Sequence, residues 1–324
     1  MVLSLQEKKH DVKMADENCT KVTQFTFLGL TEHPQLKPVL FVLFLGTYLL
    51  MLVGNLGLIA LIRVSPQLHT PMYFFLGNLS FLDICYSSTI SPKMLLDLPS
   101  ENKVISFAGC LTQLYFYAVF ATAEIYLLAA MAYDRYVAIS KPLLYEAVMS
   151  PGVCMSLVTG SYLAGLLNAT VHTSALFRLS FCGHLVINSF YCDGPPLFVV
   201  TSTDTHLNEV LLFVFVSFNM MTTNLLILTS YAHVAVAVGR MSSAAGRRKA
   251  CSTCTSHLAA VTIFYVSATI NYMQPSSSDS QDSKKIACIF YTVIVPMLNP
   301  MIYSLRNKEV KHAFSSFIRR KVYF

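Results

Sequence analysis

The chain has 324 residues, of which 54% are apolar and only 12% are charged. That charged share is roughly half of what a soluble domain carries, so the composition argues against a soluble fold and indicates a membrane protein. The net charge of +6 is small and does not point to nucleic acid as a partner.

Residues 1–38 are predicted to form an extracellular N-terminal tail. The segment is polar and lacks the apolar core of a cleavable signal peptide, so we expect the first span to act as the signal. Asn18-Cys19-Thr20 is a glycosylation sequon, which by itself is a weak signal but suits an outside tail and makes Asn18 a predicted glycosylation site. Met14 is an alternative start to Met1.

Seven apolar stretches follow the tail, each long enough to cross about 30 Å of hydrocarbon as a helix. Helices are expected because they satisfy their own backbone hydrogen bonds within the bilayer. We therefore predict an all-α membrane protein, a seven-transmembrane helix bundle occupying residues 39–304. The predicted spans are 39–62, 72–94, 110–134, 153–176, 207–238, 252–273 and 286–304.

The basic residues of the short loops predict the orientation, because Lys and Arg concentrate on the cytoplasmic side. With the N-terminus outside, thirteen of them fall on the cytoplasmic side and five on the outer side. We therefore predict a multi-pass membrane protein with its N-terminus outside and its C-terminus inside. In residues 305–324, apolar side chains recur at helical spacing among basic ones, which predicts a short amphipathic helix on the anionic inner leaflet. These apolar residues are Val310, Phe314, Phe317 and Ile318.

Four motifs in this order carry a family resemblance: Leu68–Leu76 (LHTPMYFFL), Met131–Ser140 (MAYDRYVAIS), Lys249–Leu258 (KACSTCTSHL) and Pro296–Asn307 (PMLNPMIYSLRN). Through them the chain resembles an olfactory receptor of the rhodopsin-like G-protein-coupled class, over residues 18–318. The resemblance implies a multi-pass plasma-membrane receptor rather than an enzyme. It also implies that an odorant ligand activates a stimulatory olfactory-type G protein and raises cyclic AMP.

An Asp-Arg pair, Asp134-Arg135, ends the third apolar stretch. Charges there must lie at a water boundary, because they are costly inside hydrocarbon. We expect Arg135 to pair with Asp134 at rest and to leave it on activation, where it would meet the G protein. The alternative is an arginine that only anchors the helix at the interface. The resemblance adds Tyr136, Tyr231 and Tyr303 to this predicted switch.

Four polar residues lie in the middle of different spans, where an isolated carboxylate would be expensive and should face the bundle interior. We expect them to converge as an ion site or polar core. Two carboxylates there would share a proton or hold a cation such as sodium, and the alternative is a hydrated polar core without an ion. The four residues are Asn55, Asp83, Glu124 and Asn299.

The resemblance implies a disulfide between Cys110 and Cys192. It also places Ser202 where olfactory receptors usually have a third loop cysteine, so that Cys182 is either free or competes for Cys110 or Cys192. Cys251, Cys254 and His257 have the spacing of metal ligands, but a zinc site would want a fourth. We therefore interpret this triplet as helix packing and G-protein contact, and predict no metal there.

The ligand site is predicted between the outer halves of the third, fifth, sixth and seventh helices, following family positions and helical spacing. None of the nominated residues is charged, which favours a small, neutral, volatile odorant over an amine or an acid. They are Tyr117, Ala118, Ala121, Thr122, Phe215, Asn219, Tyr265, Ala268, Thr269, Tyr272 and Thr292.

Two other functions remain open at this point. Mid-membrane carboxylates can serve as ion relays in a small secondary transporter, although such a chain should have two similar halves with broken helices, which this sequence lacks. A receptor-like protein that no longer signals is the other alternative, since Val266 and Ser202 depart from the family pattern. The four intact motifs favour a signalling receptor over both.

Overall fold

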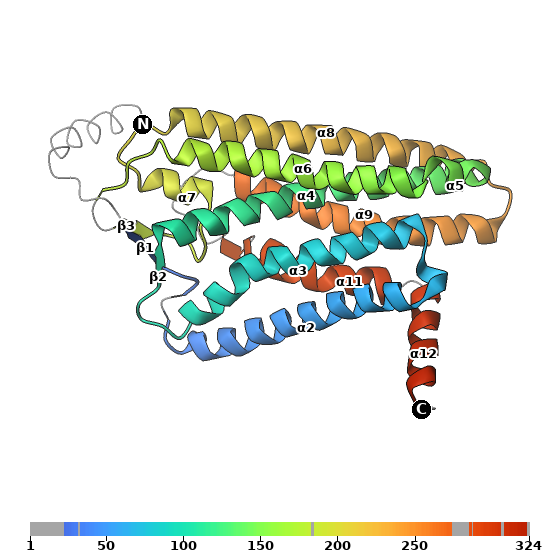
Figure 1. The fold of residues 1–324 in the computed structure, drawn as a ribbon, viewed down its shortest axis with the longest axis horizontal. Helices are drawn as coiled ribbons and strands as arrows, with labels where there is room; N and C mark the ends of the chain where they lie inside the picture. The colour runs from blue at the N-terminus through green and yellow to red at the C-terminus, as the bar shows by residue number, and fades with distance from the viewer. Residues whose placement is uncertain are drawn as a thin grey trace.

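The computed structural model describes residues 23–31, 33–182, 185–273, 285–286, 288–305 and 308–322. The predicted glycosylation site Asn18 lies outside these residues. Long helices run side by side along the long axis of the molecule (Figure 1). They are α2 (Leu36–Val64), α3 (Pro71–Asp97), α4 (Phe107–Ser140), α6 (Pro151–Leu176), α8 (His206–Gly239), α9 (Ala244–Met273) and α11 (Val295–Leu305).

Every predicted span falls on a helix, but several helices extend beyond the apolar stretches. Helix α9 begins at Ala244, well before the predicted boundary at residue 252, and Arg247 and Arg248 on this extension are exposed. The difference arises because a helix continues into water where its residues are polar. The last predicted span, 286–304, contains a π-helix, η3 (Phe290–Ile294), directly before α11.

Five of the described helices are long and apolar enough to cross a membrane: α2, α4, α6, α8 and, as far as Ile270, α9. The other two predicted spans differ for physical reasons. Helix α3 carries a buried polar row that includes Ser80, Asp83, Ser87 and Ser91, which lowers its hydropathy. The apolar part of the last span is short, Thr292–Ile302. The hydropathy of the described helices thus supports five crossings directly.

Helix α4 is the centre of the bundle and contacts α3, α6, α8 and α9. In its most apolar window 67% of the residues are buried, against 17% in α2 and in α8. The peripheral α2 exposes side chains such as Val39, Val42 and Val53, as expected of a face turned to lipid. Gly165 of α6 allows α4 to approach closely, because a Cβ there would overlap the carbonyl oxygen of Val119.

One end of the bundle, called here the sheet end, carries a small three-stranded sheet that the all-α prediction missed. Strand β1 (Gln24–Phe27) lies in the middle, antiparallel to β2 (Val104–Ser106) and parallel to β3 (Leu185–Ile187). Phe25 and Phe27 point inward and are almost fully buried in a second apolar cluster. The last residues of the predicted tail are therefore part of the fold.

The opposite end, called here the α12 end, carries the short helices η1 (Pro66–Leu68), η2 (Pro142–Leu144) and α5 (Tyr145–Val148). Helix α12 (Lys308–Val322) turns away from the bundle axis at this end (Figure 1). Val310 is buried and Phe314 is exposed. The side chains of Phe317 and Ile318 lie outside the described part, so the position of α12 on a lipid surface stays a prediction.

Candidate functional site

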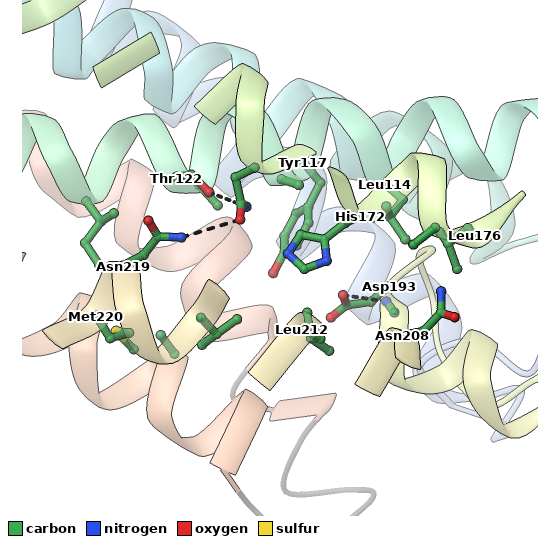
Figure 2. Close-up of a pocket in the computed structure, with 18 of the residues that line it drawn as sticks. Leu114, Tyr117, Thr122, His172, Leu176, Asp193, Asn208, Leu212, Asn219 and Met220 are labelled. Atoms are coloured by element: carbon green, nitrogen blue, oxygen red, sulfur yellow. Dashed lines mark hydrogen bonds between the residues drawn. The ribbon is translucent and has the colours of Figure 1, made fainter. Parts of the chain in front are cut away.

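A cavity of about 110 Å³ lies near the sheet end, between α4, α6, α8, α9 and the short helix α7 (Gly194–Val199) (Figure 2). An engineered apolar cavity of about 150 Å³ binds benzene, so this volume suits a small molecule. The lining is mostly apolar. It consists of Leu114, Tyr117, Ala118, Ala121, Thr122, Ile125, Asn168, His172, Ala175, Leu176, Asp193, Gly194, Phe198, Asn208, Leu212, Val216, Asn219, Met220, Phe264 and Ala268.

The structure places six of the nominated ligand residues in this lining. Helix α4 presents four of them at one face, and α8 and α9 contribute one each. They are Tyr117, Ala118, Ala121, Thr122, Asn219 and Ala268.

Four other nominated residues do not line this cavity, so their contact with a ligand stays a prediction. Phe215 packs edge-on against the His172 ring, with centroids 5.3 Å apart, and Thr269 is exposed on α9. Tyr265 forms a 2.5 Å hydrogen bond with Thr223 Oγ1. Thr292 is fully buried against α3, where its carbonyl oxygen accepts a hydrogen bond from Ser87. The side chain of Tyr272 lies outside the described residues.

The position of Thr292 has a local cause. It lies in the π-helix η3, which takes up one extra residue relative to an α-helix. An extra residue rotates every preceding side chain by about 100° relative to a continuous α-helix. Regular α-helical spacing continued through this segment therefore does not give the face on which Thr292 lies.

Sequence reasoning missed the contribution of α6 and of the loop that follows it. Asn168 and His172 are four residues apart on α6, so both side chains lie on one face and reach the cavity. This spacing of two polar residues in an apolar helix was the available signal. Asp193 comes from the loop, and its carboxylate accepts hydrogen bonds from the Gly194 amide and the Tyr191 hydroxyl. The cavity therefore contains a charged residue type, unlike the nominated set.

The polar groups at the α12-side floor of the cavity are hydrogen-bonded to one another. Asn168 Nδ2 donates to Thr122 Oγ1 at 2.9 Å, and Asn219 Nδ2 donates to Asn168 Oδ1 at 3.4 Å (Figure 2). The Tyr126 hydroxyl donates to Asn219 Oδ1 at 2.8 Å. This network joins α4, α6 and α8 without help from a ligand.

A disulfide between Cys110 of α4 and Cys192 fixes the loop over the cavity. Gln113 reinforces it: its side-chain oxygen accepts from the Cys192 amide at 2.9 Å, and its Nε2 donates to the Thr89 carbonyl of α3 at 3.0 Å. Cys182 is itself disulfide-bonded, so both alternatives left open for it are wrong. Ser202 does lie beside it, with Oγ 3.4 Å from the Cys182 sulfur.

The four mid-span polar residues do gather inside the bundle. Asn299 Nδ2 donates to both Asp83 oxygens, at 3.0 and 3.2 Å, and Asn55 Nδ2 donates to the Pro296 carbonyl at 3.0 Å. Glu124 lies close enough to Asp83 for their charges to interact. The Oδ1 atoms of Asn55 and Asn299 are buried without a hydrogen-bond partner in the described part of the chain.

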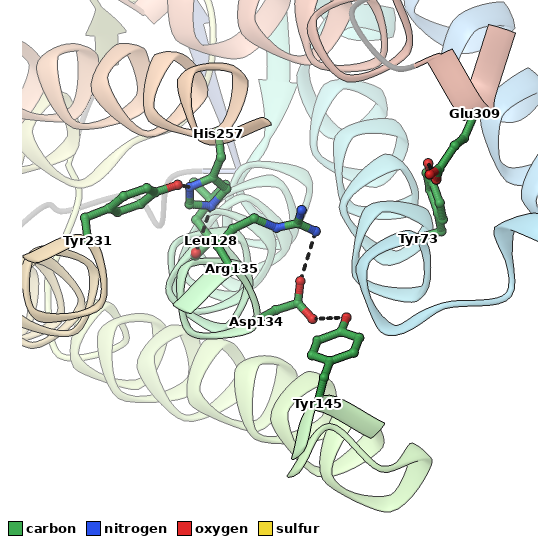
Figure 3. Close-up of polar contacts among 8 residues, drawn as sticks. All are labelled: Tyr73, Leu128, Asp134, Arg135, Tyr145, Tyr231, His257 and Glu309. Carbon is green, nitrogen blue, oxygen red and sulfur yellow. Dashed lines mark hydrogen bonds and ion pairs between the residues drawn. The ribbon is translucent and has the colours of Figure 1, made fainter. Parts of the chain in front are cut away.

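At the α12 end, Asp134 holds two partners (Figure 3). Arg135 Nη2 lies 2.9 Å from Asp134 Oδ2, and the Tyr145 hydroxyl donates to Asp134 Oδ1 at 2.7 Å. Burial and the neighbouring Asp134 charge raise the pKa of Tyr145 above its usual range, so the phenol keeps its proton and remains a donor. The expected Asp134–Arg135 pair is present, and Tyr145 is a partner that sequence reasoning missed.

Three helices meet at His257, which lies beside this ion pair in Figure 3. One ring nitrogen is 2.8 Å from the Tyr231 hydroxyl of α8, and the other is 3.1 Å from the Leu128 carbonyl of α4. Tyr136 instead packs against the His233 ring in a tilted arrangement, with centroids 5.2 Å apart. The side chain of Tyr303 lies outside the described residues. Among the described residues no cluster suits a metal ion, and His257 serves helix packing.

Helix α12 is joined to α3 by a contact that sequence reasoning also missed. The hydroxyl of Tyr73, in the motif at residues 68–76, donates to Glu309 Oε2 at 2.7 Å (Figure 3). Tyr73 is fully buried.

A family model described as olfactory receptor matches residues 44–321. The chain is 52% identical to olfactory receptor 5AP2 of Mus musculus over 95% of this chain and 97% of that protein. It is equally 52% identical to olfactory receptor 5AR1 of Homo sapiens, over 95% of this chain and 99% of that protein.

Proposed function

The chain belongs to the olfactory receptor family, and on this premise we propose that a small neutral volatile ligand binds in the cavity beside α4 and activates a stimulatory olfactory-type G protein. Members of this family are multi-pass plasma-membrane receptors and not enzymes. The observation that carries the proposal is the arrangement along α4. One helix lines the cavity near the sheet end and bears the Asp134–Arg135 pair at the α12 end.

The mechanism is a shift between two states of the bundle. At rest, Asp134 holds Arg135 and Tyr145 at the α12 end. A ligand that fits the cavity better in the active state shifts the equilibrium towards that state. Release of Arg135 then opens the α12 end to the G protein, which raises cyclic AMP through adenylyl cyclase. In this proposal the sheet end faces outside and the α12 end faces the cytoplasm, with α12 on the inner leaflet.

We include a sodium ion in the resting state. Hard cations take oxygen ligands, and the core offers the Asp83 and Glu124 carboxyl groups. It also offers two buried amide oxygens without a donor among the described residues, Asn55 Oδ1 and Asn299 Oδ1. The ion would neutralise the buried negative charge at this point. Asp83→Asn should then abolish any difference in agonist potency between sodium and potassium media, and a difference that persists would contradict the assignment.

The test of the receptor proposal is cyclic AMP in cells that express the chain at a verified surface level, against a broad odorant panel. Arg135→Ala should abolish the response at unchanged surface level. Arg178→Ala, which removes an exposed arginine near the sheet end, is the matched control and should respond normally. A full response in Arg135→Ala would contradict the switch and would call for ion-flux measurement, which tests the transporter alternative. Silence of the native chain across the panel would favour a receptor-like protein that does not signal.

A further inference from the structure

The cysteines account for one disulfide completely and for a second one only in part. The chain has nine cysteines. Cys110 and Cys192 are bonded to each other, and Cys182 is disulfide-bonded as well. Among the described residues the other cysteines are free thiols, namely Cys85, Cys154, Cys251, Cys254 and Cys288. Elimination leaves Cys19, which precedes the first described residue, Thr23.

The fold brings Cys182 close to the beginning of β1. Strands β1 and β3 run parallel at the sheet end, with Phe25 opposite Leu185 (Figure 1). The Phe181 ring lies edge-on to the Phe25 ring, with centroids 5.4 Å apart. Cys182 therefore lies between two residues that both contact β1. Because parallel strands point the same way, the chain before β1 and the chain before β3 approach the same edge of the sheet.

Cys19 is close enough along the chain to reach this edge. It lies four residues before Thr23, and four extended residues span at most about 14 Å. Thr23 is held at the sheet, because its carbonyl oxygen accepts a hydrogen bond from the Phe107 amide at 2.9 Å. The Phe107 ring packs against Phe181, with centroids 5.8 Å apart. The cysteine that follows Phe181 is thus within reach of the tail.

We propose that Cys19 and Cys182 form a disulfide that ties the N-terminal tail to the loop over the cavity. The two thiols lose two protons and two electrons as the S–S bond forms. The electrons go to the disulfide of a lumenal oxidoreductase: one thiolate attacks it, the second displaces the mixed disulfide, and the oxidoreductase leaves as a dithiol. This step rests on the orientation proposed above, which puts the sheet end on the oxidising side of the membrane.

The surroundings of Cys182 explain why its partner comes from outside the loop. Ser202 Oγ lies 3.4 Å from the Cys182 sulfur and also donates to the Ser180 carbonyl at 2.9 Å. The loop therefore places a hydroxyl group, which forms no disulfide, next to this sulfur. A cysteine at position 202 would compete with the tail for Cys182, and the chain has none there.

The first test maps the disulfides of the full chain in membranes of expressing cells. Free thiols are blocked with N-ethylmaleimide in denaturant, and the unreduced chain is digested with trypsin and chymotrypsin. Cleavage after Phe190 separates Cys182 from Cys192. Mass spectrometry should find a peptide pair that joins Cys19 to Cys182 and is lost on reduction. A blocked thiol on Cys182, or a bond from Cys182 to Cys110 or Cys192, would overturn the proposal.

The second test counts maleimide-reactive thiols in variants under the same conditions. Cys19→Ser should show one more reactive thiol per chain than the native chain, because it releases Cys182. It keeps the Asn18 sequon, so glycosylation is not altered by the change. Cys85→Ser is the matched control at a free cysteine and should show one thiol fewer. One thiol fewer in Cys19→Ser as well would mean that Cys19 is unbonded, and would overturn the proposal.

Thermal stability gives a readout that the cysteine count does not determine. Cys19→Ser and Cys182→Ser should lower the melting temperature equally, and the double variant should lower it no further, because both substitutions remove one interaction. In Cys19→Ser/Ser202→Cys, a new loop disulfide to Cys182 should return the thiol count to the native value. Additive losses of melting temperature would contradict a shared bond.

None of these readouts depends on a ligand or on a G protein. The linked peptide in a chain that gives no cyclic AMP response would contradict the receptor function and leave the disulfide supported. A cyclic AMP response from a chain in which Cys182 carries a blocked thiol would do the reverse.

Discussion

The two ends of the bundle are held together by different kinds of contact. At the sheet end, the cover of the cavity is fixed by the Cys110–Cys192 disulfide and by three paired strands. At the α12 end, the described contacts near Asp134 are an ion pair and hydrogen bonds. A disulfide holds one geometry, whereas hydrogen bonds can break and form again within the lifetime of a signal. The comparison suggests a rigid end that receives the ligand and a reversible end that responds.

The largest loss of stability should come from removing the Cys110–Cys192 disulfide at the sheet end. Cys110→Ser/Cys192→Ser removes a cross-link between residues separated by 82 positions, which in the chain-entropy model contributes roughly 4 kcal/mol. We expect most of the receptor to be lost from the cell surface and the melting temperature of the remainder to fall. Cys85→Ser, at a free and half-buried cysteine of α3, is the control. Equal behaviour of the two variants would mean that the sheet end does not depend on its disulfide.

A second variant tests whether both ends of the bundle depend on the close contact between α4 and α6. Gly165→Ala places a methyl group against the Val119 carbonyl and forces α6 away from α4. Because a backbone atom cannot move aside as a side chain can, the cost of overpacking should be about 3 kcal/mol or more. Thermal stability, ligand binding and signalling should decline together. Gly160→Ala on the same helix meets no atom within 4 Å and should change none of them. If Gly165→Ala impaired only one end, the two ends would be mechanically independent.

A smaller effect is expected from loosening the reversible end. Tyr145→Phe removes a hydrogen bond to Asp134, and such bonds to charged groups contribute about 1.5–3 kcal/mol. Because this bond is assigned to the resting state, basal cyclic AMP should rise several-fold at equal surface level. Tyr133→Phe, at an exposed tyrosine of α4, should leave the basal level as it is. An unchanged basal level in Tyr145→Phe would exclude Tyr145 from the restraint.

The smallest effect concerns the contact between α3 and α12. Tyr73→Phe removes the hydrogen bond to Glu309, and because Glu309 is exposed this bond should contribute only about 0.5–1.5 kcal/mol. Amide hydrogen exchange in α12 should accelerate while binding in the cavity stays as it was. Glu309→Gln keeps an acceptor oxygen and should have the weaker effect. If Tyr73→Phe instead changed ligand binding in the cavity, α12 would be coupled to the sheet end.

The sequence was sufficient for features that depend on local pattern. Apolar length located every long helix, and the Asp134-Arg135 pair at the end of an apolar run predicted an ion pair that the structure contains. Family positions identified the partners of the Cys110–Cys192 disulfide. In each of these cases the signal lies in a few adjacent residues or in an established motif.

Other features depend on partners that local pattern cannot identify. Strand β1 has four residues and pairs with segments far along the chain. The alternation of polar and apolar side chains over four residues is too short to predict a strand by itself. In a membrane helix the faces turned to lipid, to a neighbour and to a cavity are all apolar, which is why the contribution of His172 and Asn168 was missed. The direction in which Thr292 points depends on the π-helix η3, and no residue type in the sequence indicates a π-helix.

The central position of β1 in the sheet has a consequence for biosynthesis. The strand is made first, but its parallel partner, beginning opposite Phe25 at Leu185, follows about 160 residues later. At a synthesis rate of about 5–20 residues per second, β1 waits on the order of 10–30 s for this partner. Phe107, which packs against the Phe25 ring, is made midway through that interval, whereas Ile187 of the same buried cluster is made only at its end. The cover of the cavity can therefore be completed only once β3 has been made, while α8, α9 and α11 are still to follow, and a quality-control factor could recognise the incomplete sheet before that point.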